Sequence, residues 1–189
     1  MNNGKLFIIS GPSGVGKSSL INDALSDLSG FIKSISFTTR PKRKDEVQGR
    51  QYRFVTKEEF EELIKKDLFL EWASYCGYLY GTPKEFVINQ LNSGENVILE
   101  IEVKGAMQVK EKIKDAFLIF ITVSSLKQLE ERITGRGTDN ADEIKKRIDI
   151  VKHELKYQKY YNCIIINNNY NEALLNLKNV LISKKGGNS

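Results

Sequence analysis

The sequence predicts an α/β domain with a parallel β-sheet at its core. Apolar runs of strand length recur along its 189 residues without alternating with polar residues, as expected for strands that are buried on both faces. Segments with apolar residues three and four positions apart lie between these runs and predict helices. Alternating strands and helices favour parallel strands joined by right-handed crossovers. The length predicts one domain, 1–189.

Buried strands are expected at four places along the chain. They are 6–10, 97–101, 117–123 and 163–167, and they are rich in Ile, Val and Phe. The helical spacing of apolar residues covers 17–28, 104–113, 125–133 and 171–182. We interpret three segments as the core of the domain: 1–35, 91–124 and 154–189.

Two stretches depart from this alternation. The first, 36–90, is basic and aromatic, and the capping pattern Thr56-Lys57-Glu58-Glu59 opens a helix within it. We interpret it as an inserted subdomain. The second, 125–153, contains Gly135-Arg136-Gly137 and a polar segment between two helical stretches. We predict that it forms a mobile lid, because its glycines favour hinge motion.

The composition and the N-terminus exclude several classes of protein. With 40% hydrophobic and 28% charged residues, the chain has the composition of a globular domain. No apolar run approaches the roughly 18 residues that span a bilayer, and no signal peptide is visible. We therefore expect a cytoplasmic protein that does not bind membranes. Cys76 and Cys163 lie far apart and predict two thiols rather than a disulfide or a zinc site.

A phosphate-binding loop follows the first predicted strand and precedes the first predicted helix. Its pattern, GxxxxGK[ST], is met by Gly11, Pro12, Ser13, Gly14, Val15, Gly16, Lys17 and Ser18. Successive backbone N–H groups of such a loop face one anion, and the helix N-terminus adds partial positive charge. The loop predicts a three-layer P-loop NTPase fold that binds ATP through these residues and Ser19. Lys17 would reach the β and γ phosphates, and Ser18 would supply an oxygen to Mg2+.

A second basic segment favours a kinase over the GTPases and ATPases that share the P-loop. The net charge is +5, and much of the excess lies within 36–53, at Arg40, Lys42, Arg43, Lys44, Arg50 and Arg53. Arginine suits bidentate contact with the phosphate of an acceptor, and Tyr52 can add a hydroxyl donor. No aromatic stacking platform interleaves this charge, so we expect no nucleic-acid partner.

The order and spacing of several motifs resemble the guanylate kinase family over nearly the whole chain. Besides the P-loop, they are Ser36-Phe37-Thr38-Thr39-Arg40, then Arg43, Gly49 and Tyr52, then Phe69-Leu70-Glu71-Trp72-Ala73, then Tyr80-Gly81-Thr82-Pro83. The resemblance implies transfer of the γ-phosphoryl group from MgATP to GMP. It implies a GMP site made of Ser36, Arg40, Arg43, Tyr52, Glu71, Tyr80 and Thr82.

The same resemblance implies roles in catalysis and in ATP binding. Arg40, Arg43, Tyr52 and Tyr80 would hold the phosphate of GMP. Arg132, Arg136 and Arg147 resemble lid arginines that would act on the transferring group together with Lys17 and Arg43. Asn167, after the last predicted strand, resembles a residue that contacts the adenine of ATP.

The chemistry of Glu71 agrees with a guanine acceptor. Guanine presents its N1–H and its 2-amino group side by side, and one ionised carboxylate can accept from both. Ser36 or Thr82 can donate to the guanine O6. Adenine would leave the carboxylate facing a lone pair, and an unpaired buried polar group costs about 1–3 kcal/mol. We therefore expect at least tenfold preference for GMP over AMP.

Two segments depart from the pattern of the family. Its usual Arg-x-Pro-Arg-x-Gly-Glu is here Arg40-Pro41-Lys42-Arg43-Lys44-Asp45-Glu46, which alters the path of the loop between the arginines. Its Asp-x-Asp is here Glu100-Ile101-Glu102. We assign Glu100 and Glu102 jointly to the substrate site, with Glu100 and Ser18 at Mg2+. The lone His153 lies in a polar helical stretch and is expected at the surface.

Two other functions remain open at this point. One is a related P-loop kinase that acts on a different phosphorylated acceptor. The other is a guanylate-kinase-like module that has lost catalysis and binds a protein, although such modules often have a damaged phosphate loop and this one is intact. The sequence leaves the oligomeric state open, a homo-oligomer included.

Overall fold

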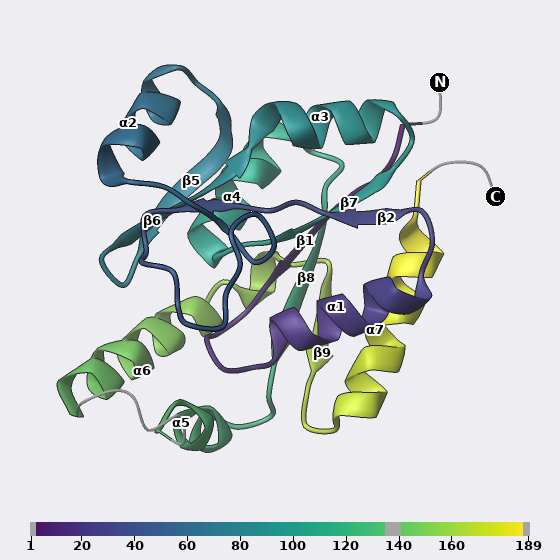
Figure 1. Ribbon diagram of the computed structural model, residues 1–189. Coiled ribbons are helices and arrows are strands. Elements are labelled where there is room, and N and C mark those ends of the chain that lie inside the picture. Colours follow the sequence, from purple (N-terminus) through teal and green to yellow (C-terminus); the bar gives the residue numbers. More distant parts are fainter. Residues whose placement is uncertain (1–2, 135–140, 187–189) are drawn as a thin grey trace.

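The computed structural model describes the backbone of residues 3–134 and 141–186 and the side chains of 3–131 and 148–186 (Figure 1). Its central sheet has five parallel strands in the order β2-β7-β1-β8-β9. These strands are β1 (Leu6–Ser10), β2 (Phe31–Lys33), β7 (Asn96–Glu100), β8 (Phe117–Thr122) and β9 (Cys163–Ile166). The four predicted strands are confirmed, and β2 adds an edge strand that the pattern did not predict.

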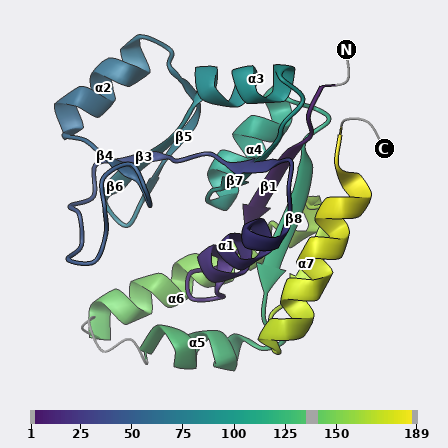
Figure 2. The ribbon, with the colours of Figure 1, turned by 45° about the vertical axis from the view of Figure 1, so that its right-hand side comes forward.

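Helices cover both faces of the central sheet and give the predicted three layers. Helices α1 (Lys17–Asp27) and α7 (Tyr170–Lys184) pack on one face, and α3 (Lys84–Asn92) and α4 (Val103–Lys112) pack on the other (Figure 2). On β1, Phe7 and Ile9 point toward the first pair, whereas Leu6 and Ile8 point toward the second. The strand is apolar throughout because both of its faces are buried.

A small second sheet projects from this core. It has the order β4-β3-β6-β5, formed by β3 (Phe37–Thr38), β4 (Arg53–Phe54), β5 (Phe69–Tyr75) and β6 (Tyr78–Pro83). Helix α2 (Lys57–Lys65) covers one face, where the Phe60 and Phe69 rings stack with centroids 4.5 Å apart. Thr56 and Glu59 form the predicted capping box at its start.

Helices from both the inserted segment and the lid segment pack against the hydrophobic core. The predicted end of the insertion at residue 90 falls inside α3, whose Val87 and Leu91 pack against the central sheet. The lid segment contains α5 (Leu126–Thr134) and α6 (Ala141–Leu155), whose Leu129 and Val151 join the core on the α1 side. In both views α5 and α6 lie on the same side of the central strands as the small sheet (Figures 1 and 2).

Three smaller expectations also find an outcome. Across the described ranges, no helix combines the length and the apolar character that a bilayer crossing requires. Cys76 and Cys163 form no disulfide, as predicted. His153 is exposed on α6, followed by a 3-10 turn at Gln158–Tyr160.

Candidate active site

The phosphate-binding loop joins the end of β1 to the start of α1. Gly16 precedes the helix with φ 86° and ψ 22°, a left-handed conformation that favours glycine. The ammonium of Lys17 lies over the loop and donates to the carbonyl oxygens of Gly11, at 2.5 Å, and Pro12, at 3.1 Å. A cation and the N-terminus of α1 therefore face the same concavity, which suits a polyphosphate.

Asn167 supports this loop from beneath. It follows β9, is 5% exposed, and donates from its Nδ2 to the carbonyl oxygen of Val15 at 2.7 Å. A Cβ on Gly16 would lie 2.9 Å from the same Nδ2, so the side-chain amide packs directly against the loop. The structure thus gives Asn167 a contact with the P-loop backbone, while its predicted contact with adenine stays a prediction.

Ser18 and Glu100 form a hydrogen-bonded pair beside the loop. The Ser18 hydroxyl donates to Oε1 of Glu100 at 2.5 Å, and the ammonium of Lys33, on β2, contacts Oε2 at 2.6 Å. Burial opposes ionisation of Glu100, but Lys33, Ser18 and the charge of Lys17 outweigh it and lower the pKa of the carboxyl. An ionised carboxylate beside a hydroxyl is a hard oxygen donor set.

The small sheet presents its polar residues on one face. Glu71 lies opposite Thr82, and Tyr80 lies opposite both Ala73 and Thr38. Directly opposed residues share a face, as do residues two apart on one strand. Ser36 and Arg40, two positions on either side of Thr38, therefore belong to the same face. The opposite face carries the aromatic side chains that pack on α2, including Phe69, because a break in the strand register between Phe69 and Glu71 reverses the alternation there.

Arg40 is held in place from several sides. Its guanidinium makes two hydrogen bonds to Glu46, at 2.7 and 3.0 Å, and lies 5.6 Å from the centroids of Tyr52 and Phe54. The hydrogen bonds from Arg40 lower the pKa of Glu46 against the effect of its burial. The backbone N–H of Arg43 donates to the same carboxylate at 2.8 Å, so Glu46 sets the path of the 40–46 loop.

Glu71 is a buried carboxylate on β5. Its side chain is paired with Thr82, whose hydroxyl donates to Oε1 at 2.6 Å, and the residue is only 3% exposed. Burial raises the pKa of Glu71 to about 7, although the Thr82 hydrogen bond and the charge of Lys112 oppose that rise. The carboxyl group of Glu71 can therefore lose its proton near neutral pH when a pair of hydrogen-bond donors approaches it.

A second buried acid, Glu154, lies where α6 meets the active site. It is 3% exposed and neighbours Glu102, the residue that precedes α4. Burial and then the charge of Glu102 hold the pKa of Glu154 well above its ordinary value. Tyr75, at the end of β5, also has a raised pKa because it is buried and lies near Glu102. Glu154 on α6, Tyr75 on the small sheet and Glu102 next to α4 are therefore neighbours, although they belong to three different parts of the fold.

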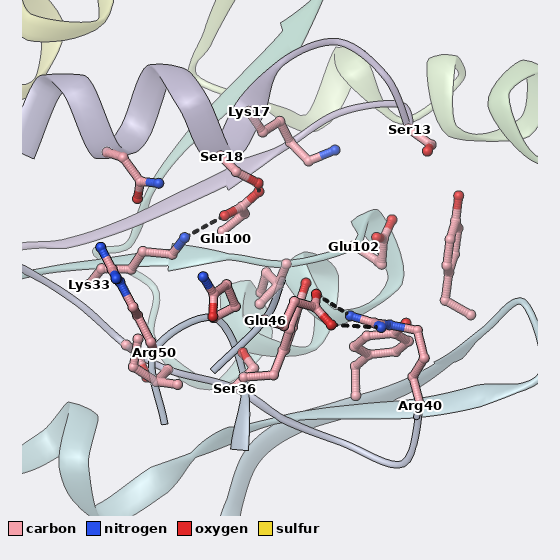
Figure 3. Close-up of a pocket in the computed structure, with 18 of the residues that line it drawn as sticks. Ser13, Lys17, Ser18, Lys33, Ser36, Arg40, Glu46, Arg50, Glu100 and Glu102 are labelled. Atoms are coloured by element: carbon pink, nitrogen blue, oxygen red, sulfur yellow. Dashed lines mark hydrogen bonds and ion pairs between the residues drawn. The ribbon is translucent and has the colours of Figure 1, made fainter. Parts of the chain in front are cut away.

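One cleft of about 810 Å³ lies between the phosphate-binding loop and the polar face of the small sheet. Figure 3 shows Lys17 and Ser18 on one side of it, with Ser36 and Arg40 on the other. Most of the predicted site residues line it, namely Ser13, Gly14, Gly16, Lys17, Ser18, Ser19, Ser36, Arg40, Arg43, Tyr52, Tyr80, Glu100 and Glu102. Glu71, Thr82 and Asn167 are buried and do not line it. Arg136 and the side chains of Arg132 and Arg147 lie outside the described residues.

Comparison with known proteins decides the family. The sequence profile described as Guanylate kinase matches residues 3–184. The chain belongs to the guanylate kinase family. A guanylate kinase of Syntrophomonas wolfei is 43% identical over 182 residues, which cover 96% of this chain and 93% of that protein. One of Streptococcus agalactiae is 45% identical over 179 residues, covering 94% and 86%.

A solved structure gives the same result for the fold. The guanylate kinase of Anaplasma phagocytophilum superposes with a TM-score of 0.82 at 27% identity, covering 97% of this chain and 87% of that chain. Membership of the guanylate kinase family confirms the resemblance that the motifs indicated. The motifs did not single out Lys33 or Glu154, and they gave Glu46 no role. Each of them contacts a predicted site residue from a distant part of the chain or from an adjoining loop.

Proposed function

We propose that this chain transfers the γ-phosphoryl group of ATP to GMP, giving ADP and GDP, with Mg2+ as the cofactor. One observation carries the proposal. A single cleft joins an intact phosphate-binding loop to the polar face of the small sheet. Two anion sites that face each other can align a donor phosphate with an acceptor phosphate, and alignment supplies much of the catalysis in phosphoryl transfer.

The donor half of the cleft would bind ATP. Lys17 is already positioned over the loop by two backbone carbonyl oxygens, from which its ammonium can turn to the β and γ phosphates. The backbone of residues 11–19 would supply the N–H donors, and Asn167 keeps the loop in shape through Val15. Cations placed in advance stabilise charge on the phosphoryl oxygens without reorganisation during the reaction.

Ser18 and Glu100 fit a magnesium ion. They meet at 2.5 Å, the carboxylate is ionised, and both oxygens face the cleft. Mg2+ prefers such hard ligands and keeps part of its water shell, so the longer Glu100 side chain is compatible with direct or water-mediated contact. When bound there, the ion would neutralise charge on the β and γ phosphates.

The acceptor half would bind the phosphate of GMP. Arg40 is fixed by Glu46 and by the aromatic rings beside it, and it lines the cleft. Arg43, Tyr52 and Tyr80 line the same wall. A phosphate monoester is largely ionised above its second pKa of about 6, so the attacking oxygen needs no base from the protein near neutral pH.

Glu71 would select the base of the acceptor. Its carboxylate would accept from N1–H and the 2-amino group of guanine, while Ser36 or Thr82 donates to O6. Because Glu71 is buried and does not line the cleft, binding of the base requires the groups that cover it to move. The sites of Arg132, Arg136 and Arg147 complete the proposal, since closure of the lid segment would bring cations to the phosphoryl group and exclude water.

The proposal is tested by following ADP release with GMP or AMP, with and without Mg2+. We expect turnover with GMP that depends on Mg2+ and is lost in K17A. Turnover of AMP or of a sugar phosphate at an equal rate would favour a related P-loop kinase. GMP binding without turnover would favour the inactive module. A cytoplasmic location, the absence of a nucleic-acid partner and a homo-oligomeric state stay predictions.

A further inference from the structure

Helix α4 contains a glycine that its backbone does not require. Gly105 lies in the first turn of Val103–Lys112 and is buried. Its φ is not among the positive values found elsewhere in the chain, so its conformation is open to any L-residue. Glycine lowers helix stability relative to alanine at such a position. Some feature outside the helix backbone must therefore favour glycine here.

That feature is the carboxyl group of Glu71. A Cβ on Gly105 would lie 2.2 Å from Oε2 of Glu71 and 2.9 Å from its Cδ. Both distances are far shorter than the roughly 3.5 Å of van der Waals contact. The three nearest heavy atoms to such a Cβ all belong to Glu71. A side chain at this position would therefore displace the Glu71 carboxyl group first.

Displacement would be costly for recognition, because Glu71 has few other places to go. The residue is 3% exposed, and its Oε1 accepts the 2.6 Å hydrogen bond from Thr82. A shift of Oε2 away from α4 moves the carboxylate relative to the hydrogen bond that Oε1 accepts from Thr82. Two parallel hydrogen bonds to guanine demand that both carboxylate oxygens be directed correctly.

We propose that Gly105 is a positioning residue that sets the preference for guanine, because the space it leaves is occupied by the Glu71 carboxylate. This inference rests on the proposed function, in which Glu71 binds the base of the acceptor. It assigns to α4 a part in recognition that is separate from the P-loop and from the phosphate-binding arginines. The role is steric: the helix provides room rather than a hydrogen bond.

Four variants test the role of Gly105 by steady-state kinetics and thermal unfolding. In G105A we expect the KM for GMP to rise about tenfold or more, the KM for ATP to stay within about twofold, and the Tm to fall, because the buried carboxyl must move to make room. E71D shortens the acid by one methylene and withdraws it from α4. In that background, adding G105A should change the KM for GMP by less than about threefold. K104A, an exposed neighbour on the same helical turn, is the matched control and should behave like the unaltered chain.

Each outcome of this series has one meaning. An unchanged KM for GMP in G105A, with an active unaltered chain, would overturn the role of Gly105 alone. The same rise in the E71D background would overturn it too, since the methyl group would then act independently of the longer acid. Loss of folding in both G105A and E71D/G105A would show that the methyl group meets something else. No GMP turnover by the unaltered chain would instead overturn the proposed function.

Discussion

Thr82 and Glu71 face each other across two antiparallel strands, and the Thr82 hydroxyl donates a 2.6 Å hydrogen bond to the buried carboxylate. The pair lies at the base of the polar face that also carries Ser36, Arg40 and Tyr80. Burial works against ionisation of Glu71, and the hydrogen bond works for it. The balance leaves the acid close to its midpoint at neutral pH, which makes both recognition and stability depend on pH.

We expect GMP binding to tighten as the pH rises through about 7. Burial raises the pKa of Glu71 to about 7, and only the ionised form can accept from both guanine donors. Below that pKa, a proton must leave before GMP binds, so the KM for GMP should rise up to about tenfold per pH unit. The measurement is KM between pH 6 and 8.5. E71Q provides the control, because it keeps the titration of the substrate phosphate and lacks that of the acid.

We expect E71Q to be more stable than the unaltered chain at pH 8 and to lose this advantage at pH 4.5. The pKa of Glu71 is raised in the folded state, so the folded chain binds this proton more tightly than the unfolded chain. Stability is therefore lost as the pH rises from about 4.5 to about 7, by on the order of 3 kcal/mol at most. Urea unfolding at both pH values measures the difference. An advantage of equal size at both would contradict the assignment.

Removing Lys33 should destabilise the chain more at pH 8 than at pH 5. In K33M, Glu100 keeps its burial and loses the ammonium that lowers its pKa. An uncompensated buried carboxylate costs about 1–3 kcal/mol, and protonation at lower pH relieves that cost. Unfolding free energies of K33M at the two pH values provide the check. K5M alters a half-buried lysine directly before β1 and serves as the comparison. An identical loss at both pH values would show that Lys33 acts by packing alone.

Asn167→Ala should weaken the binding of ATP and of other nucleoside triphosphates to the same extent. The side chain donates to Val15 within the P-loop, and one lost hydrogen bond of about 1 kcal/mol corresponds to about fivefold in KM. The KM for GMP should not change. Asn168→Ala is the matched control, since Asn168 bonds to Ser124 instead. A loss seen with ATP and absent with other nucleoside triphosphates would instead support the predicted contact with adenine.

Glu46→Ala should raise the KM for GMP by about tenfold and leave the KM for ATP unchanged. Without its carboxylate, Arg40 loses two hydrogen bonds and the loop loses its contact with the Arg43 backbone, so ordering of both arginines is added to the cost of binding. Asp45→Ala is the exposed control next to it. Equal KM values for the two variants would show that Glu46 has no part in shaping the site.

The sequence predicts the parts of this protein that depend on local pattern. Strands buried on both faces and the GxxxxGK[ST] loop each have a local signature, and the structure reproduces them at β1, α1 and Gly16. Strand β2 was missed because it is a short, half-buried edge strand, and α3 because Pro83 opens it without a side-chain cap.

Contacts between distant residues could not be read from pattern. Lys33 meets Glu100 across neighbouring strands, and Gly105 meets Glu71 between a helix and the small sheet. Nothing in the local sequence of either glycine or lysine distinguishes it from a structural residue. Asn167 shows the reverse case, since the family resemblance implies a contact with adenine, whereas its side chain donates to the loop backbone at Val15. Only packing reveals which side chain touches which.

The central claim is that Glu71 selects guanine at the small-sheet side of the cleft that also holds the phosphate-binding loop. The most direct measurement is the ratio of kcat/KM for GMP to that for AMP, in the unaltered chain and in E71Q at pH 8. We predict a ratio of at least about ten in the unaltered chain, with a fall toward one in E71Q that comes from GMP alone. A ratio that stays the same in E71Q would contradict the account.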